Sequence, residues 1–582
     1  MFTLAKKAAR VLLNEGYSAF YEKIRWRIDE RRKHRLYQEW IEKYDTYVES
    51  DLEQILERIQ AFERRPLISI LMPVYDVDEI WLRKAIDSVR AQIYEKWELC
   101  IADDRSPSPH VREVLAEYAA TDDRIKVVFR VENGHISAAS NSALELVTGE
   151  ITVLMDHDDE LSPAALFFVA KELNEYPDAD IIYSDEDKID TSGERFQPSF
   201  KPDWSPELIQ SLNLVTHLIA YRTRLIRECG GFRLGYEGSQ DYDLALRVSE
   251  LTSPDRIRHI PKILYHWRAI SGSVALDGEE KPYAHERART AISDHFARRG
   301  IKATAVRGTG HLHRVIHELP PTLPKISVVL TDGPLSPKLI TAITTGSGQF
   351  PIEILRPTLK SDTDHDDLDM VSFVPSTDGS RYALLNAGAA AATGDLLCFL
   401  DASTIAVFDD WLSVLVGYAI NNEIGAVGAK ILHANGTIKH SGYVLRENEG
   451  VLSPYRNARR TIIGNFFWMV AVRNVSALSA DCLMVRREDF GEIGGFDAAT
   501  FPEVYADVDL CLRIRERGLR NVWTPWAEVV QNRETVRESV KAFEQLNVRW
   551  AGILKDDPYY NPNLKLDGKD FSLAFPPHLE KI

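Results

Sequence analysis

Short apolar runs alternate with helical patterns in the N-terminal part of the chain, and this alternation restricts the chain to few folds. In order, the runs and patterns are 67-LISILMPVY-75, 81-WLRKAIDSVRAQ-92, 97-WELCIADD-104, 111-VREVLAEYAA-120 and 125-IKVVFRV-131. The first, third and fifth are short and mainly apolar, as is typical of strands buried on both faces. Strands separated by helices predict a mostly parallel sheet, in which ligands bind beyond the carboxyl ends of the strands.

The chain also contains an internal repeat. Gly134, Asn141, Gly149 and Asp156 recur at one constant spacing as Gly379, Asn386, Gly394 and Asp401, and a second constant spacing relates Asp241 and Asp243 to Asp507 and Asp509. The length of 582 residues also exceeds what one hydrophobic core usually holds. Together these features predict an α/β protein with two tandem Rossmann-like modules.

Composition divides the chain into five predicted parts. They are a basic amphipathic helical segment over 1–65, a first module over 66–318, a Pro-rich linker over 319–324, a second module over 325–550 and a C-terminal tail over 551–582. The linker has the sequence LPPTLP, and the apolar run KISVVL follows it directly. Pro-rich joints of this kind are typical of module boundaries.

Charge is distributed unevenly along the chain. The formal net charge is −17, whereas residues 1–36 carry ten Lys or Arg against four acids. The acidic body argues against nucleic acid as a partner. The basic N-terminal segment, which is rich in aromatic residues, predicts either peripheral contact with an anionic membrane surface or a solvated helical arm that packs on the next module.

Cysteine usage and hydropathy bear on the compartment. The five cysteines lie apart, without CxxC spacing, which suits reduced thiols in a reducing compartment. No stretch approaches the roughly 18 consecutive apolar residues of a membrane span, and the N-terminus lacks the apolar core of a signal peptide. We therefore expect a cytoplasmic or peripheral membrane protein.

Carboxylates crowd at the ends of two predicted strands. They are Asp156, Asp158 and Asp159 after the run 150-EITVLM-155, and Asp103 and Asp104 at the end of the run 97-WELCIADD-104. Like charges this close raise one another's pKa unless a cation compensates them. Oxygen ligands without cysteines suit Mg²⁺ or Mn²⁺, ions that commonly bridge substrate phosphates. The acids therefore predict a divalent metal and a diphosphate ligand.

Two further stretches carry candidate site residues. Asp241 lies at the start of the pattern 239-SQDYDLALR-247, where it is either a general base or an acid that caps its own helix. In 264-LYHWRAISGSVA-275, His266 and Arg268 are suited to phosphate oxygens or, for His266, a metal. The alternative is a loop in which Arg268 pairs with a local acid. The histidines of 311-HLHRVIH-317 lack the further ligands of a zinc site, so we expect a structural or surface role for them.

Five motifs in order carry a family resemblance: ISILMPVY, ADDRSPSP, GHISAASNSALELVTGEITVLMDHDDELSP, SQDYDLALR and LYHWR. With them, residues 67 to about 300 resemble the family 2 inverting glycosyltransferases of the GT-A fold. The subgroup is similar to two-module bacterial enzymes of O-antigen and capsule assembly, often rhamnosyltransferases. Residues 325 to about 545 resemble the second module of that subgroup, so the resemblance covers most of the chain.

The resemblance implies a function and a set of site residues. It implies a UDP- or dTDP-sugar donor, a glycan or lipid-linked acceptor, Mg²⁺ or Mn²⁺ as cofactor, and a location at the cytoplasmic face of the inner membrane. Pro73 and Tyr75 would line the nucleotide pocket, and Asp104, with Asp103 beside it, would bind the nucleobase. Asp156 would contact the ribose, the diphosphate and the metal, Asp158 and His266 would bind the metal, and Arg268 would bind the diphosphate. Asp241 would be the catalytic base.

The second module departs from this pattern. In 401-DAST-404, Ser403 replaces the metal-binding carboxylate, and the run 352-IEILRPTLK-360 lacks the two acids that would read the base. Asp401 and Asp507 remain as its candidate site residues. We expect a degenerate module that binds acceptor glycan or the first module. Two alternatives stay open: both modules are active, or the whole chain is a carbohydrate-binding scaffold. A nucleotidyltransferase is disfavoured, because the sequence lacks the Gly- and Lys-rich phosphate loop that such an enzyme would need.

Overall fold

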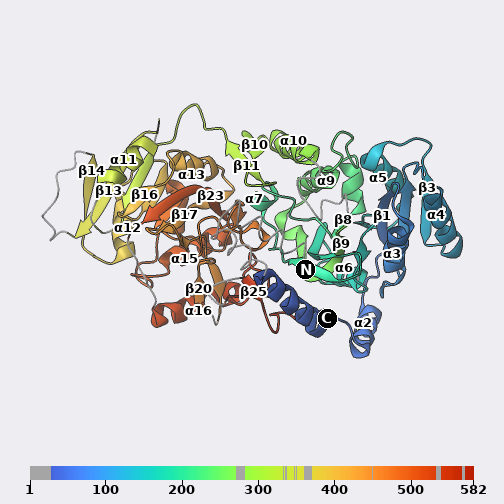
Figure 1. Ribbon diagram of the computed structural model, residues 1–582. Helices are drawn as coiled ribbons and strands as arrows, with labels where there is room; N and C mark the ends of the chain where they lie inside the picture. The colour runs from blue at the N-terminus through green and yellow to red at the C-terminus, as the bar shows by residue number, and fades with distance from the viewer. Residues whose placement is uncertain are drawn as a thin grey trace, which may run out of the picture.

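Two mixed β-sheets, each with parallel and antiparallel strands and each from one half of the chain, lie side by side in the computed structural model (Figure 1). The structure describes residues 28–270, 282–331, 333, 337–346, 348, 350–359, 370–447, 450–532, 539–566 and 571–582. The predicted α/β fold with two tandem modules after a helical segment is confirmed. The boundaries chosen for the five parts stay predictions.

The first sheet has the strand order β3-β2-β1-β4-β8-β6-β9-β5, with β7 beside β6. Its strands are β1 (Ile68–Val74), β2 (Trp97–Asp103), β3 (Ile125–Phe129), β4 (Ile151–Leu154), β5 (Glu160–Leu161), β6 (Ile181–Ile189), β7 (Arg195–Ser199), β8 (Ile219–Arg222) and β9 (Ile257–Arg268). Strands β1 to β4 run parallel, whereas β8 is antiparallel to β4. All four apolar runs predicted as strands are strands.

Helices cover both faces of this sheet. They are α3 (Glu79–Arg90), α4 (Pro109–Thr121) and α6 (Ala165–Glu175) on one face, and α5 (His135–Leu146), α8 (Thr223–Glu228), α9 (Gln240–Ser249) and α10 (Pro282–Arg298) on the other. Side chains of β1 alternate between the two cores: Ile70 and Met72 enter the first, and Leu71 enters the second. The period of two follows from the pleat of a strand.

The second sheet repeats this topology, with the order β14-β13-β12-β15-β22-β17-β23-β16. Its strands along this order are β12 (Ile326–Leu330), β13 (Ile352–Leu359), β14 (Val371–Ser376), β15 (Leu396–Leu400), β16 (Thr404–Ala406), β17 (Ile424–His433), β22 (Cys482–Arg486) and β23 (Arg520–Gln531), with β18 (Ile438–His440) beside β17 and β21 (Arg473–Asn474) beside β23. Its helices are α11 (Pro337–Gly346), α12 (Arg381–Ala391), α13 (Trp411–Ala419), α14 (Arg487–Ile493), α15 (Ala506–Glu516) and α16 (Val540–Lys555). The internal repeat is therefore a repeat of fold.

The repeated residues hold corresponding joints of the two sheets. The Asn141 side chain hydrogen-bonds both backbone groups of Phe232 at 2.8 Å, and Asn386 does the same for Phe496 at 2.8 and 3.0 Å. A Cβ on Gly149 would lie 2.5 Å from the Leu67 carbonyl oxygen. These positions are repeated because the fold requires them.

Segments from both ends of the chain connect the modules. Residues 28–44 form a helix whose Trp40 is buried against Phe200. In the C-terminal part, which was expected to be a tail, Asn561 donates hydrogen bonds to Asp185 at 2.8 Å and to the Lys201 carbonyl at 2.9 Å. Most of the basic segment over 1–36 lies outside the described residues. Within the described part, no helix is both long and apolar enough to cross a membrane.

Candidate active site

A cleft of about 1260 Å³ opens at the carboxyl ends of the parallel strands in the first module. Its lining includes six residues that the sequence predicted for the site: Pro73, Tyr75, Asp104, Asp156, Asp158 and Asp241. They come from four separate segments of the chain. The structure thus brings three of the predicted acids, Asp104, Asp156 and Asp158, and the predicted base Asp241 to one shared cavity.

The two acids after β2 have different positions. The buried Asp104 carboxylate accepts hydrogen bonds from Arg130 Nε at 2.7 Å and from the Gly134 N–H at 3.0 Å, and it reaches the cleft. Asp103 instead accepts the Ser106 N–H at 3.1 Å and is not among the described lining residues. Asp103 therefore shapes the turn that places Asp104.

The acidic loop after β4 is held by β9. The Tyr265 hydroxyl accepts the Asp156 N–H at 3.1 Å and donates to the Asp159 carboxylate at 2.6 Å. Burial, with the charges of Asp158 and Asp156 added to it, raises the pKa of Asp159 well above its usual range. Burial also raises the pKa of Asp158, with a contribution from Asp156. A cation at this loop would reverse both shifts.

A histidine that the sequence did not indicate completes a set of metal-ligand atoms. Ligand atoms of Asp156, Asp159 and His217 all lie within 4.8 Å of one another. His217 Nδ1 hydrogen-bonds Glu186 Oε2 at 3.0 Å. Burial alone would lower the pKa of His217, but the hydrogen bond and charge of Glu186, together with the charges of Asp159 and Asp156, outweigh burial and raise this pKa to about 9. A carboxylate behind a histidine is common at metal sites, because it orients the ring.

A buried lysine fixes the backbone at His217. The Lys201 side chain is fully buried, and its Nζ donates to the carbonyl oxygens of Ser184 and His217 at 2.8 Å each, as well as to that of Thr216. The His217 ring also stacks on Tyr265, with centroids 4.6 Å apart. The orientation of this imidazole is therefore determined by its surroundings.

The structure does not bring His266 to this group. Neighbouring residues of a strand point to opposite faces, so Tyr265 faces the acids and His266 faces away. His266 Nδ1 lies 2.6 Å from an Asp187 carboxylate oxygen. Asp187 also accepts hydrogen bonds from Tyr37 at 2.5 Å and Arg195 at 2.6 Å. His266 belongs to a buried network that fixes the N-terminal helix.

Arg268 supports the acidic loop from behind. Its buried guanidinium donates to the Asp158 carbonyl at 2.7 Å, pairs with Glu160 and lies 4.5 Å from the Trp81 ring centroid. Arg268 is not among the described residues that line the cleft, whereas Trp81 is. These contacts agree with the alternative interpretation of Arg268, pairing with a local acid.

Asp241 lies in the first turn of α9 and faces the cleft. Its carboxylate accepts a hydrogen bond from Asn213 Nδ2 at 2.8 Å. Burial, with the charge of Asp156 added to it, raises the pKa of Asp241. A carboxylate with a raised pKa is a better general base, provided that it reaches the proton it removes.

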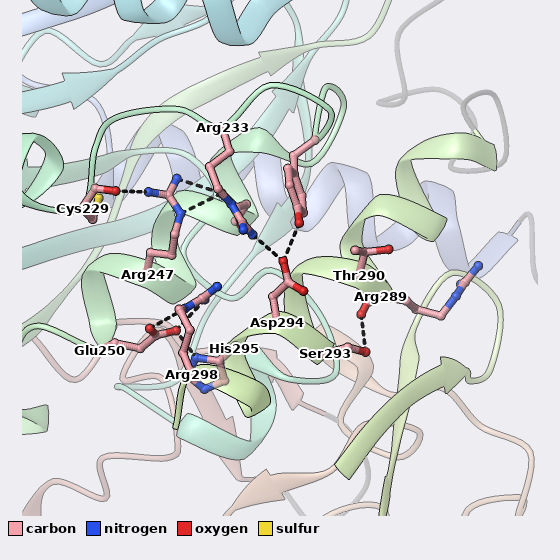
Figure 2. A network of polar contacts seen from close by, with 12 residues as sticks. Cys229, Arg233, Arg247, Glu250, Arg289, Thr290, Ser293, Asp294, His295 and Arg298 are labelled. Atoms are coloured by element: carbon pink, nitrogen blue, oxygen red, sulfur yellow. Dashed lines mark hydrogen bonds and ion pairs between the residues drawn. The ribbon is translucent and has the colours of Figure 1, made fainter. Parts of the chain in front are cut away.

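A network of ion pairs fixes the helix that carries Asp241 (Figure 2). Asp243, two residues after Asp241 on α9, accepts hydrogen bonds from Arg247 Nε at 2.8 Å and Arg233 Nε at 3.1 Å. Arg233 also donates to Asp294 on α10 at 2.9 Å. The repeated acid Asp243 is therefore a structural residue, and the network holds α9 against α10.

The register of the strands relates the two modules' sites. Equivalent antiparallel pairs are Leu154 with Ile219 in the first module and Phe399 with Leu483 in the second. In the first module His217 lies two residues before Ile219, and in the second module Asp481 lies two residues before Leu483. The constant spacing that relates Asp156 to Asp401 also relates Asp159 to Thr404. Two of the three candidate metal ligands of the first module are thus replaced in the second.

Basic side chains occupy the corresponding region of the second module. Arg381 donates to Asp481 at 2.7 Å, and Lys439 Nζ lies 3.7 Å from the same carboxylate. Asp401 accepts hydrogen bonds from the Ser403 N–H at 2.8 Å and its hydroxyl at 2.5 Å. Asp507 accepts the Ala480 N–H at 3.0 Å. Protein cations and local hydrogen bonds satisfy these carboxylates.

Family models match both modules. The model of glycosyl transferase family 2 matches residues 69–228, and that of glycosyltransferase-like family 2 matches residues 363–552. Together with the repeated sheet order, these matches define a protein of two α/β glycosyltransferase modules. The chain belongs to glycosyltransferase family 2, which confirms the resemblance inferred from its motifs.

Two relatives match nearly the whole chain. The uncharacterized protein y4gI of Sinorhizobium fredii is 37% identical over 90% of this chain and 60% of its own length. The O-antigen biosynthesis protein RfbC of Myxococcus xanthus is 33% identical over 89% of this chain and 42% of its own length. The chain thus spans about half the length of these curated relatives.

Among solved structures, S. aureus TarS 1-349 in complex with UDP-GlcNAc is 18% identical, with a TM-score of 0.31 over 40% of this chain and 72% of that one. The family assignment rests on the family models and the relatives rather than on this similarity.

Proposed function

We propose that the first module is a metal-dependent inverting glycosyltransferase. It moves a sugar from a UDP- or dTDP-sugar to a glycan or lipid-linked acceptor in bacterial cell-surface polysaccharide synthesis, such as O-antigen or capsule assembly. The observation that carries this proposal is the shared cleft, which both Asp156 and Asp241 line. The similarity to RfbC supports the polysaccharide context.

The donor set of the first module fits a divalent ion. Asp156, Asp159 and His217 would hold it, and Asp158, which lines the cleft on the same loop, is proposed to supply a further carboxylate ligand. Two carboxylates with one imidazole suit Mn²⁺ at least as well as Mg²⁺. When bound, the ion offsets the diphosphate charge and stabilises the leaving group.

The chain's own residues account for the proton transfer and the positioning. Asp241 takes the proton of an acceptor hydroxyl as that oxygen forms a bond to the anomeric carbon of the donor sugar. The bond from this carbon to the diphosphate oxygen breaks, and the nucleoside diphosphate leaves with the electron pair. Attack opposite the leaving group inverts the anomeric carbon. Tyr75 and Asp104, which both line the cleft, are proposed to hold the nucleotide.

The second module is proposed to be non-catalytic. Arg381 and Lys439 neutralise Asp481 at the position equivalent to the first-module metal site. A metal there would have to displace two buried protein cations from Asp481, which is costly because both would lose the carboxylate that offsets their charge. The proposed location is the cytoplasmic face of the inner membrane, with residues 1–36 as the contact to anionic lipid.

A donor panel tests the proposed function. Purified protein with Mn²⁺ is incubated with UDP- and dTDP-sugars, and release of nucleoside diphosphate is measured. We expect release from at least one donor by the wild type and none by Asp158→Ala. Absence of both binding and release for every donor would instead support a carbohydrate-binding scaffold, and release of pyrophosphate would indicate a nucleotidyltransferase.

A further inference from the structure

A loop of the second module lines part of the first module's cleft. Gly464, Phe466 and Phe467 line this cleft, although they lie more than a hundred residues beyond the linker. Phe466 and Phe467 are partly buried and pack on the first-module core formed by α5, α9 and α10. The active-site cleft is therefore built by both modules.

Hydrogen bonds to neighbouring residues fix the backbone conformation of this loop. The Met469 N–H donates to the Ile463 carbonyl at 2.9 Å, and the Asn465 N–H donates to the Tyr455 hydroxyl at 2.5 Å. Phe466 and Phe467 have φ of 42° and 57°, in the left-handed region that non-glycine residues rarely adopt. Such a conformation persists only where its surroundings hold it, and it frequently occurs at functional sites.

The two phenylalanines belong to an aromatic patch beside the proposed base. Tyr283, His285 and His311 of the first module line the same part of the cleft, and the His311 ring meets Phe467 edge-on with centroids 5.0 Å apart. Ser239, two residues before Asp241, donates to the Ala284 carbonyl at 2.7 Å. The patch therefore adjoins the helix start that carries Asp241.

We propose that Phe466 and Phe467 form the acceptor subsite, where an aromatic ring stacks on a neutral pyranose ring and directs its hydroxyl toward Asp241. This proposal rests on the proposed function of the first module. The C–H groups on one face of a pyranose ring are complementary to the negative face of an aromatic ring. Histidine and tyrosine at the rim supply hydrogen-bonding groups for sugar hydroxyls.

The proposal gives the non-catalytic module a role in the reaction. Asp104 and Tyr75 lie at the β1–β2 side of the cleft, where the nucleotide is proposed to bind, whereas the acceptor must reach Asp241. The second module would thus select the acceptor while the first holds the donor. Phe466 and Phe467 act as specificity residues rather than as catalytic residues.

Substitutions at Phe466 in the full chain test this assignment. Phe466→Leu keeps most of the volume but removes the aromatic face, and Phe466→Tyr keeps the ring. Ile463→Ala, on the exposed part of the same loop, is the matched control. Saturation-transfer NMR follows the methyl glycosides of rhamnose, glucose, galactose and N-acetylglucosamine in the presence of UDP and Mn²⁺.

We expect at least one glycoside to bind the wild type through ring C–H protons, with a Kd about tenfold higher in Phe466→Leu and little changed in the other two variants. UDP affinity should be equal in all four proteins. Equal glycoside affinity in Phe466→Leu, or no glycoside binding by a wild type that binds UDP, would overturn the subsite alone. Loss of UDP binding by the wild type would instead overturn the proposed function. If Phe466→Leu unfolds, the aromatic protons of the wild type are irradiated selectively. The proposed subsite requires saturation transfer from these aromatic rings to the C–H protons of the bound glycoside, and absence of this transfer would overturn it.

Discussion

His217 Nδ1 and Glu186 Oε2 lie 3.0 Å apart, and this contact leaves Nε2 as the ring nitrogen available to a metal. The ring is oriented on its other side by stacking on Tyr265. The pairing of a carboxylate with a histidine in this way raises the basicity of the ring and fixes its direction. His217, rather than His266, is thus the histidine that the geometry places beside Asp156 and Asp159.

We predict that His217→Ala weakens Mn²⁺-dependent UDP binding at least 100-fold. Glu186→Gln should weaken it about tenfold, because it removes the carboxylate that orients the ring. The matched variant His266→Gln should leave the affinity within about twofold, whatever its effect on stability. Calorimetry on the folded variants measures all three. Equal losses for the two histidines would contradict the proposed metal site.

A second prediction separates the two modules. Asp241→Asn should lower the transfer rate by about 10³-fold, because a general base commonly contributes 10² to 10⁴. Its UDP affinity should stay unchanged. Asp507→Asn is the equivalent change in the second module and should leave the rate within about twofold. A strong loss in Asp507→Asn, with the protein folded, would indicate that the second module also catalyses transfer.

The ion-pair network of Figure 2 predicts a difference in stability rather than in chemistry. Asp243 is fully buried and pairs with both Arg233 and Arg247, so Asp243→Asn should cost about 3 kcal/mol of unfolding free energy. Asp294→Asn removes a partly exposed partner of Arg233 and should cost about 1 kcal/mol or less. Urea unfolding measures both, and equal costs would show that burial does not govern this network.

A buried histidine predicts a dependence of stability on pH. His259 lies between Asp185 at 3.0 Å and Asp203 at 3.1 Å. Burial alone would lower its pKa, but the Asp185 charge and the two hydrogen bonds raise this pKa to about 9. The unfolded value is about 6.5. The folded state therefore binds this proton more tightly, and the resulting stability is complete below pH 6.5 and lost as the pH rises to 9.

From His259 we expect a loss of up to about 3 kcal/mol between pH 6 and pH 9.5. Urea unfolding across this range measures the slope, and His259→Gln should have a flatter one. Identical slopes for the two proteins would contradict the assignment of this proton to His259.

Much of the fold follows from local sequence patterns, because buried parallel strands and repeated glycines carry their own signals. Gly149 recurs as Gly394 since neither position leaves room for a Cβ. The acids after β4 could be placed beside Asp104 because parallel strands end at one edge of a sheet. The same rule does not say which face of β9 points to them, so the sequence does not show that Tyr265 faces the acids while His266 contacts Asp187.

Residues brought to the cleft by long-range packing carried no such signal. His217 reaches the acids only through the antiparallel pairing of β8 with β4, and its segment matches no spacing rule. Phe466 comes from the other module altogether. His311, for which the sequence predicts a structural or surface role, lines the cleft just before β11 (His313–His317), and its ring contacts Phe467.

Calorimetric titration of the wild-type protein with UDP and dTDP, with Mn²⁺ or with EDTA, tests the central claim most directly. The account predicts that at least one nucleotide binds with Mn²⁺, that EDTA abolishes this binding, and that Asp158→Ala behaves like the EDTA sample. Binding that is equally strong in EDTA, or no binding of either nucleotide to the folded protein, would contradict a metal-assisted nucleotide site in the first module.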